Sequence, residues 1–104
     1  MQREKICAVL GLARTGIPAA RFLAERGAQV VGYDDRELDQ LSEEARDLQN
    51  IGVELRVGAH HNFRGLEECS LIVLSPGLKI HHPPLREVLE RCEQKRIEII
   101  GELE

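Results

Sequence analysis

Continuous and alternating apolar runs divide the chain into segments that take turns as strands and helices. Ile6 to Leu10 and Leu71 to Leu74 are unbroken apolar runs, as expected of strands covered on both faces of a sheet. Gln29 to Tyr33, which stops at Asp34, and Ile97 to Ile100 are predicted as two further strands. Apolar and polar residues alternate over positions 53–57, which is typical of an edge strand with one face in water. The pattern therefore predicts five strands.

Apolar residues at helical spacing fill the segments between these strands. The three stripes comprise Ile17, Ala20, Leu23, Ala24 and Gly27, then Leu38, Leu41, Ala45 and Leu48, and finally Leu85, Val88, Leu89 and Cys92. Thr15 is placed to cap the first predicted helix and Gly27 to end it, and the second helix is expected to stop near Gly52. The polar connection over 59–69 is expected to hold one short helical turn.

Strands that alternate with helices call for a parallel sheet with right-handed crossovers. We predict an α/β, Rossmann-like three-layer fold with a five-stranded parallel sheet in the order 3-2-1-4-5. The connections then leave strands one and four in opposite directions, which opens a crevice at their carboxyl ends. A chain of 104 residues is expected to form one domain, residues 1–104, with a single core.

The turn after the first strand carries the strongest chemical signal. It reads Gly11-Leu12-Ala13-Arg14-Thr15-Gly16 and leads from a strand into a helix. Such a turn offers backbone N–H groups and a helix N-terminus to a phosphate. Ala13 stands where a dinucleotide-binding fingerprint carries another glycine, which counts mildly against NAD. The alternative interpretation is that Gly11 and Gly16 only shape the turn.

Charged residues follow the second strand, where a carboxylate reaches a ribose or a base. Asp34 is the candidate for that contact, with a plain exposed strand end as the alternative. Asp35 is well placed to cap the next helix. Arg36 either pairs with a phosphate or balances the two aspartates, and spacing alone leaves both interpretations open.

The fourth strand ends in Ser75-Pro76-Gly77, beside the predicted crevice. Gly77 permits a close backbone approach, and its N–H group is a candidate donor to a phosphate oxygen. The alternative is that this turn only terminates the strand. We predict that this turn and the glycine turn form the two walls of the crevice.

Composition and charge exclude several classes of partner and site. A net charge of −4 and 3% aromatic residues disfavour nucleic acid and anionic membranes. The first apolar run is too short for a signal peptide or a membrane span, so a cytoplasmic location is expected. Cys7, Cys69 and Cys92 form no C-x-x-C pair and are expected in the core.

Catalytic and metal-binding patterns are missing from the sequence. His60-His61 and His81-His82 match no zinc spacing, so we expect solvated loop histidines and no metal site. We find neither a nucleophile–base constellation nor a Walker A pattern, and we assign no catalytic residue.

Five motifs taken together resemble a known family. They are Gly11-Leu12-Ala13-Arg14-Thr15-Gly16, Asp34-Asp35-Arg36, Ser75-Pro76-Gly77, His82-Pro83-Pro84-Leu85 and Ile99-Ile100-Gly101-Glu102-Leu103-Glu104. In this order, and over essentially the whole chain, they are similar to the N-terminal domain of the UDP-N-acetylmuramoyl-L-alanine:D-glutamate ligases, in the Mur ligase family. The family usually has glycine at the position of Ala13 and often threonine at that of Asp35.

The resemblance implies a domain that holds the UDP end of UDP-N-acetylmuramoyl-L-alanine, a precursor of peptidoglycan. By position, Arg14 and Thr15 lie beside the uracil and the phosphates, and Asp34 hydrogen-bonds the uridine. The implied site comprises Gly11, Arg14, Thr15, Gly16, Asp34, Asp35, Arg36, Ser75 and Gly77.

The resemblance also implies that the other substrates bind to other domains of the full-length enzyme. In the family, ATP and Mg²⁺ bind to a central domain, and a C-terminal domain helps to bind D-glutamate. We therefore expect a full-length ATP-dependent ligase of cell-wall biogenesis, whose N-terminal domain holds no cofactor and does not catalyse alone. The expected partner is the nucleotide substrate, and the expected state is a monomer. The alternatives are an NAD(H)-binding regulatory module and an interaction domain with a vestigial crevice.

Overall fold

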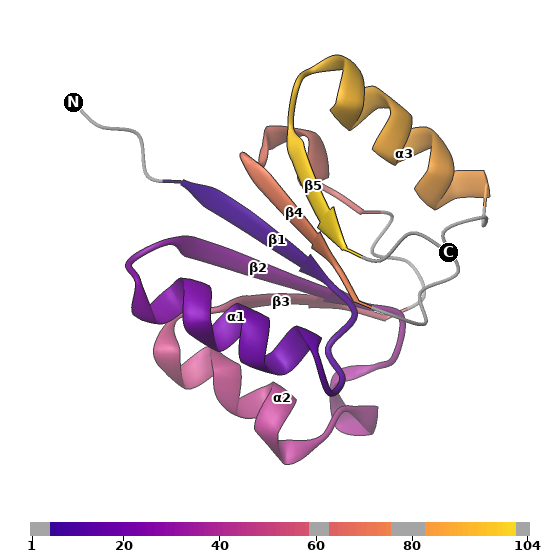
Figure 1. Ribbon diagram of the computed structural model, residues 1–104. Coiled ribbons are helices and arrows are strands. Elements are labelled where there is room, and N and C mark those ends of the chain that lie inside the picture. The colour runs from indigo at the N-terminus through magenta and orange to yellow at the C-terminus, as the bar shows by residue number, and fades with distance from the viewer. Residues whose placement is uncertain (1–4, 59–62, 76–82, 102–104) are drawn as a thin grey trace.

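A five-stranded parallel sheet forms the centre of the molecule (Figure 1). The computed structural model describes residues 5–58, 63–75 and 83–101. The strands are β1 (Ile6–Leu10), β2 (Gln29–Asp34), β3 (Glu54–Val57), β4 (Leu71–Leu74) and β5 (Glu98–Gly101). Every neighbouring pair is parallel, and the order is β3-β2-β1-β4-β5. The predicted α/β, Rossmann-like fold and its strand order are confirmed.

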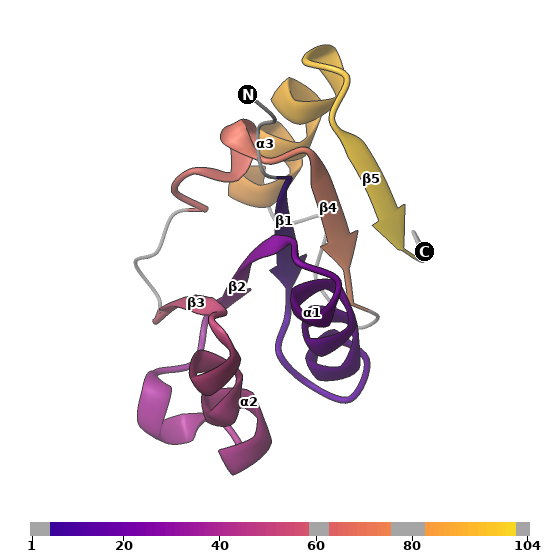
Figure 2. The same ribbon diagram turned by 90° about the vertical axis from the view of Figure 1, so that its left-hand side faces the viewer.

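Helices cover both faces of this sheet. Helices α1 (Gly16–Glu25) and α2 (Glu43–Asp47) lie on one side, and α3 (Pro83–Gln94) lies on the other, as Figures 1 and 2 show. Each helical layer closes its own apolar core against the sheet. These cores bury β1 from Cys7 to Leu10, whereas in β4 only Ile72 and Leu74 are fully buried.

The two cores draw on opposite faces of the same strands. The core under α3 includes Ala8, Leu10, Tyr33, Leu66, Ile72, Leu74, Leu85 and Cys92. The core under α1 and α2 includes Val9, Leu12, Ile17, Ala20, Val30, Leu41, Ala45 and Leu48. Neighbouring residues of β1 therefore point alternately into the two cores, as the two-residue period of a strand requires.

The second predicted helix is wrong as a continuous element. The chain forms the 3₁₀ turn η1 (Leu38–Gln40), the short α2, and the 3₁₀ turn η2 (Leu48–Ile51). Leu41 and Ser42 between η1 and α2 are extended, with ψ angles of 153° and 159°. The Ser42 hydroxyl accepts a hydrogen bond from the Ala45 N–H group at 3.2 Å and so starts a new helix. Of the predicted apolar stripe, Leu41, Ala45 and Leu48 are buried, whereas Leu38 is 40% exposed. The buried residues belong to separate turns rather than to one helix.

The predictions for the third strand, for the connection that follows it and for the cysteines are confirmed. The strand β3 lies at an edge of the sheet, and the described part of the connection before β4 contains the 3₁₀ turn η3 (Leu66–Glu68). All three cysteines are free and buried. No helix among the described residues has both the length and the apolar character needed to cross a bilayer. The four histidines lie outside the described residues.

Candidate nucleotide-binding site

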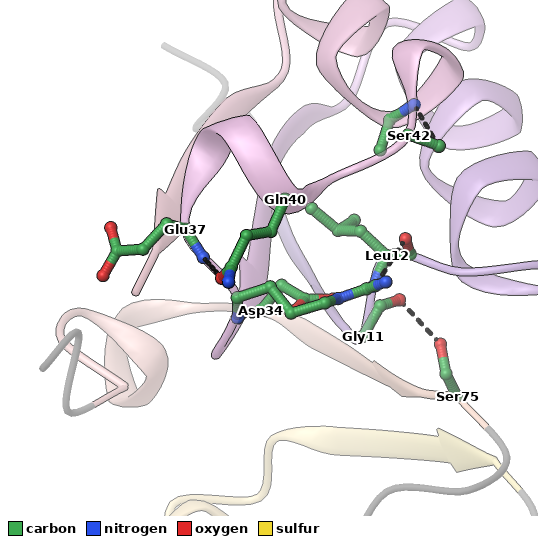
Figure 3. Close-up of polar contacts among 9 residues, drawn as sticks. Gly11, Leu12, Asp34, Glu37, Gln40, Ser42 and Ser75 are labelled. Atoms are coloured by element: carbon green, nitrogen blue, oxygen red, sulfur yellow. Dashed lines mark hydrogen bonds and ion pairs between the residues drawn. The ribbon is translucent and has the colours of Figure 1, made fainter. Parts of the chain in front are cut away.

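The turn from β1 into α1 lies between the carboxyl ends of two strands. Leu10, the last residue of β1, pairs with Tyr33 of β2 on one side and with Leu74 of β4 on the other. The residues that follow these partners are Asp34 and Ser75. Both side chains reach the backbone of the turn (Figure 3). Strands one and four therefore end side by side, as the fold prediction required.

Gly11 is held from both neighbouring strands. Its N–H group donates to the Tyr33 carbonyl oxygen at 2.7 Å, and its own carbonyl oxygen accepts from the Ser75 hydroxyl at 2.8 Å. The φ angle of Gly11 is +95°, a conformation that L side chains rarely adopt. Ser75 is only 7% exposed. Both backbone polar groups of Gly11 are thus engaged within the protein.

Leu12 anchors the turn through its side chain and its backbone. The side chain is 1% exposed and packs over Gly32 of β2, where an added Cβ would lie 2.9 Å from a Leu12 methyl group. The Leu12 N–H group donates to Asp34 Oδ2 at 2.9 Å, and its carbonyl oxygen accepts from Arg36 Nη2 at 3.2 Å. The sequence interpretation missed Leu12, although a glycine inside a strand can signal a close approach.

The Asp34 carboxylate is saturated by hydrogen bonds from the chain itself. Oδ1 accepts from the Arg36 backbone N–H group and from Arg36 Nε, each at 2.9 Å. Oδ2 accepts from the Leu12 N–H group and from Arg36 Nη2, again at 2.9 Å. A carboxylate has about four acceptor positions, so all of them are used. The Asp34 side chain is 9% exposed, whereas that of Arg36 is 47% exposed.

These contacts also set the protonation state of Asp34. Burial disfavours the charged carboxylate, but the hydrogen bonds from Arg36 and Leu12 outweigh it. The pKa of Asp34 therefore lies below its ordinary value of 3.8. The pKa of Arg36 is raised by its hydrogen bonds to Asp34. The pair is ionised and neutral overall at physiological pH.

Gly16 allows the start of α1 to lie against the turn. A Cβ at this position would be 1.8 Å from the Gly11 carbonyl oxygen and 2.8 Å from Ser75 Oγ. Only glycine fits there without displacing one of these groups. The two glycines and Ser75 are therefore brought together by the fold.

The next part of the turn is left open toward solvent. Ala13, Arg14 and Thr15 are exposed, and the N–H groups of residues 13–16 find no acceptor within the described part of the chain. Thr15 occupies the N-cap position of α1, but its side chain makes no capping hydrogen bond. The prediction that Thr15 caps the helix through its hydroxyl is therefore wrong. The open donors, the N-terminus of α1 and the exposed Arg14 together suit an anion.

For two other predicted site residues, Asp35 and Gly77, we describe no contact with the turn. Asp35 is exposed and directly follows β2. Gly77 lies outside the described residues, as does the rest of the wall that we predicted after Ser75. The predicted contact between Gly77 and a phosphate therefore stays a prediction.

A surface hollow of about 510 Å³ lies near these residues, on η1 and α2. It is lined by Glu37, Leu38, Asp39 and Arg46. Two carboxylates against one guanidinium do not suit a phosphate-bearing ligand. The described residues contain no group of three or more side chains suited to a metal ion.

Known proteins resemble the chain over most of its length. The family described as Mur ligase MurD-like, N-terminal domain, matches residues 5–101. The UDP-N-acetylmuramoylalanine--D-glutamate ligase of Trichlorobacter lovleyi is 38% identical over 88 residues, which are 85% of this chain and 20% of the relative. The ligase of the same name from Bordetella pertussis is 37% identical over 99 residues, 92% of this chain and 19% of the relative. The chain thus spans about a fifth of the length of these relatives.

A solved structure shares the fold at low identity. AtPrR2 with NADP⁺ and (+)pinoresinol matches with a TM-score of 0.62 over 94% of this chain and 35% of that chain, at 13% identity. This match shows the Rossmann-type fold alone. The family match and the ligase relatives, by contrast, cover the turn, the β2 end and the β4 end together. The chain therefore belongs to the MurD-like N-terminal domain family of the Mur ligases.

Proposed function

We propose that this domain binds the uridine diphosphate end of UDP-N-acetylmuramoyl-L-alanine. The observation that carries the proposal is the β1–α1 turn, where the open N–H groups of residues 13–16 lie at the N-terminus of α1. A diphosphate is the part of the nucleotide that such a turn suits best. The names of the relatives supply the substrate class, since they act on UDP-N-acetylmuramoylalanine.

The region that we propose to form the site is the set predicted from the sequence, and it includes residues that shape the turn as well as residues exposed to the ligand. It comprises Gly11, Arg14, Thr15, Gly16, Asp34, Asp35, Arg36, Ser75 and Gly77. Arg14 and Thr15 are exposed beside the open donors, so their side chains are available to the phosphates and the uridine. The Arg36 side chain is half-exposed while it holds Asp34, so we propose that the ligand reaches its exposed part.

We further propose that the domain serves an ATP-dependent ligase that adds D-glutamate in the cytoplasm during peptidoglycan synthesis. The lengths of the relatives support this proposal, because four-fifths of each lies outside the region matched here. ATP and Mg²⁺ would bind in those other parts. Residues 1–104 would form the nucleotide-binding domain and would not ligate alone.

An NAD(H)-binding module is the second candidate, since AtPrR2, which shares the fold, was solved with NADP⁺. In NAD-binding Rossmann domains the acidic residue after the second strand accepts a hydrogen bond from the ribose 2′-hydroxyl. The Asp34 carboxylate is already saturated by Arg36 and Leu12, which disfavours this contact. Ala13 disfavours it as well.

Isothermal titration calorimetry separates the two candidates. The 104-residue chain is titrated with UDP-N-acetylmuramoyl-L-alanine, with UDP and with NADH. We expect heat of binding from both uridine nucleotides and none from NADH. Binding of NADH alone would overturn the proposal in favour of the second candidate, and no binding at all would favour a vestigial site.

A further inference from the structure

Asp34 and Ser75 lie on opposite sides of the β1–α1 turn, and both contact it through hydrogen bonds to its backbone. Asp34 Oδ2 accepts from the Leu12 N–H group at 2.9 Å, and Ser75 Oγ donates to the Gly11 carbonyl oxygen at 2.8 Å (Figure 3). Asp34 ends β2 and Ser75 directly follows β4, two strands that do not pair with each other because β1 lies between them. The turn is thus held from both sides.

All four backbone polar groups of Gly11 and Leu12 are engaged in this arrangement. Tyr33 and Ser75 hold Gly11, while Asp34 and Arg36 hold Leu12. The Leu12 side chain is also fixed in the core over Gly32. The first two residues of the turn, directly before the four open N–H groups, are therefore held by contacts that exist without a ligand.

We propose that Asp34 and Ser75 are positioning residues, which act on the nucleotide by locking the turn rather than by touching the ligand. This inference rests on the proposed function for the identity of the ligand. Asp34 has no acceptor position left for a hydroxyl or base N–H group. Ser75 is buried and commits its proton to Gly11. The locked turn presents its open donors in a fixed geometry, so less ordering is required when a diphosphate binds.

The test compares Asp34→Asn and Ser75→Ala with matched controls by NMR and calorimetry. Asp39→Asn is the control carboxylate, exposed on η1, and Ser70→Ala is the control hydroxyl, exposed at the other end of β4. Amide hydrogen exchange and the ¹H–¹⁵N spectrum are recorded for the ligand-free 104-residue chain. UDP affinity is then measured for each variant.

We expect Asp34→Asn to raise the exchange rate of the ligand-free Leu12 amide at least tenfold and to move its proton resonance upfield. Ser75→Ala should shift the resonances of Gly11 to Gly16. Both variants should bind UDP at least fivefold more weakly, while the two controls match the unsubstituted chain. Because the two variants act from different strands, the inference stays testable if one of them does not fold.

Two outcomes would overturn the inference. A loss of UDP affinity with an unchanged ligand-free turn would show that the side chains touch the ligand directly. An unchanged affinity with a released turn would show that the locking has no bearing on binding. Failure of the unsubstituted chain to bind UDP is a different result, because it contradicts the proposed function itself, whereas the exchange data still report on the locking.

Discussion

At the residue scale, the polar groups of the site divide into those already hydrogen-bonded within the protein and those left open to a ligand. The spacing of Asp34 after the glycine turn predicted its place at the strand end, and that place is confirmed. Its saturation by Arg36 and Leu12 could not be predicted, because it depends on a side-chain rotamer and on the path of a neighbouring backbone. The same holds for Ser75, whose bond to Gly11 joins residues far apart in the sequence.

Gly16→Ala tests the close approach of α1 to the turn. The new Cβ would lie 1.8 Å from the Gly11 carbonyl oxygen, so the turn or the helix must move. We expect a loss of about 3 kcal/mol in the free energy of unfolding, measured with urea. Gly27→Ala is the control, because its Cβ meets no atom within 4 Å although φ is +88°. It should cost about 1–2 kcal/mol. A smaller loss for Gly16→Ala than for Gly27→Ala would contradict the clash.

The lowered pKa of Asp34 predicts a specific dependence of stability on pH. A group whose pKa is lower in the folded state stabilises the fold above its unfolded pKa, here the ordinary 3.8, and this contribution is lost as pH falls toward the folded value. The free energies of unfolding of the unsubstituted chain and Asp34→Asn should therefore differ by a constant amount above about pH 5. The difference should shrink below pH 3.8. Urea titrations from pH 7 to pH 3 measure it, and a difference that does not vary with pH would refute the assignment.

At the element scale, strands were easier to predict than helix boundaries. The runs at β1 and β4 are confirmed without change, because continuous apolar sequence permits few other places in a sheet. The segment that contains η1, α2 and η2 was predicted as one helix. The spacing of its apolar residues is compatible both with one continuous helix and with three short helical turns. The extended conformation of Leu41 and Ser42 is a local choice that this spacing does not reveal.

The two helix N-termini predict opposite results for removal of a hydroxyl group. Ser42→Ala removes the acceptor for the Ala45 N–H group and should cost about 1 kcal/mol in the free energy of unfolding. Thr15→Ala removes no capping bond and should change stability by less than about 0.5 kcal/mol. Thermal and urea unfolding of both variants provide the comparison. Equal losses, or a larger loss for Thr15→Ala, would contradict these cap assignments.

At the scale of the whole molecule, the alternation of strands and helices was sufficient to predict the topology. The order β3-β2-β1-β4-β5 follows from right-handed crossovers that change direction after β3. This order places the ends of β2 and β4 on either side of the turn. The wall beyond Ser75 lies outside the described residues, so that half of the predicted crevice stays a prediction.

The three buried cysteines report on the packing of the protein interior, and two of them, Cys69 and Cys92, belong to the core under α3. All three are buried, and burial raises the pKa of Cys69 to about 11. The thiols of the folded protein should therefore be protonated and inaccessible at pH 8. We expect a chromogenic disulfide reagent to modify none of them in the folded chain and all three in guanidinium chloride. Rapid modification of one thiol in the folded chain would contradict the packing of its core.

We propose above that the open N–H groups of the β1–α1 turn bind the diphosphate of a uridine nucleotide. The most direct measurement is an NMR titration of the ¹⁵N-labelled chain with UDP-N-acetylmuramoyl-L-alanine. We expect the amide resonances of residues 13–16 to shift most and these amides to become protected from exchange. Saturable binding that leaves these four amides unchanged, with shifts confined to the hollow of Glu37, Leu38, Asp39 and Arg46, would contradict it.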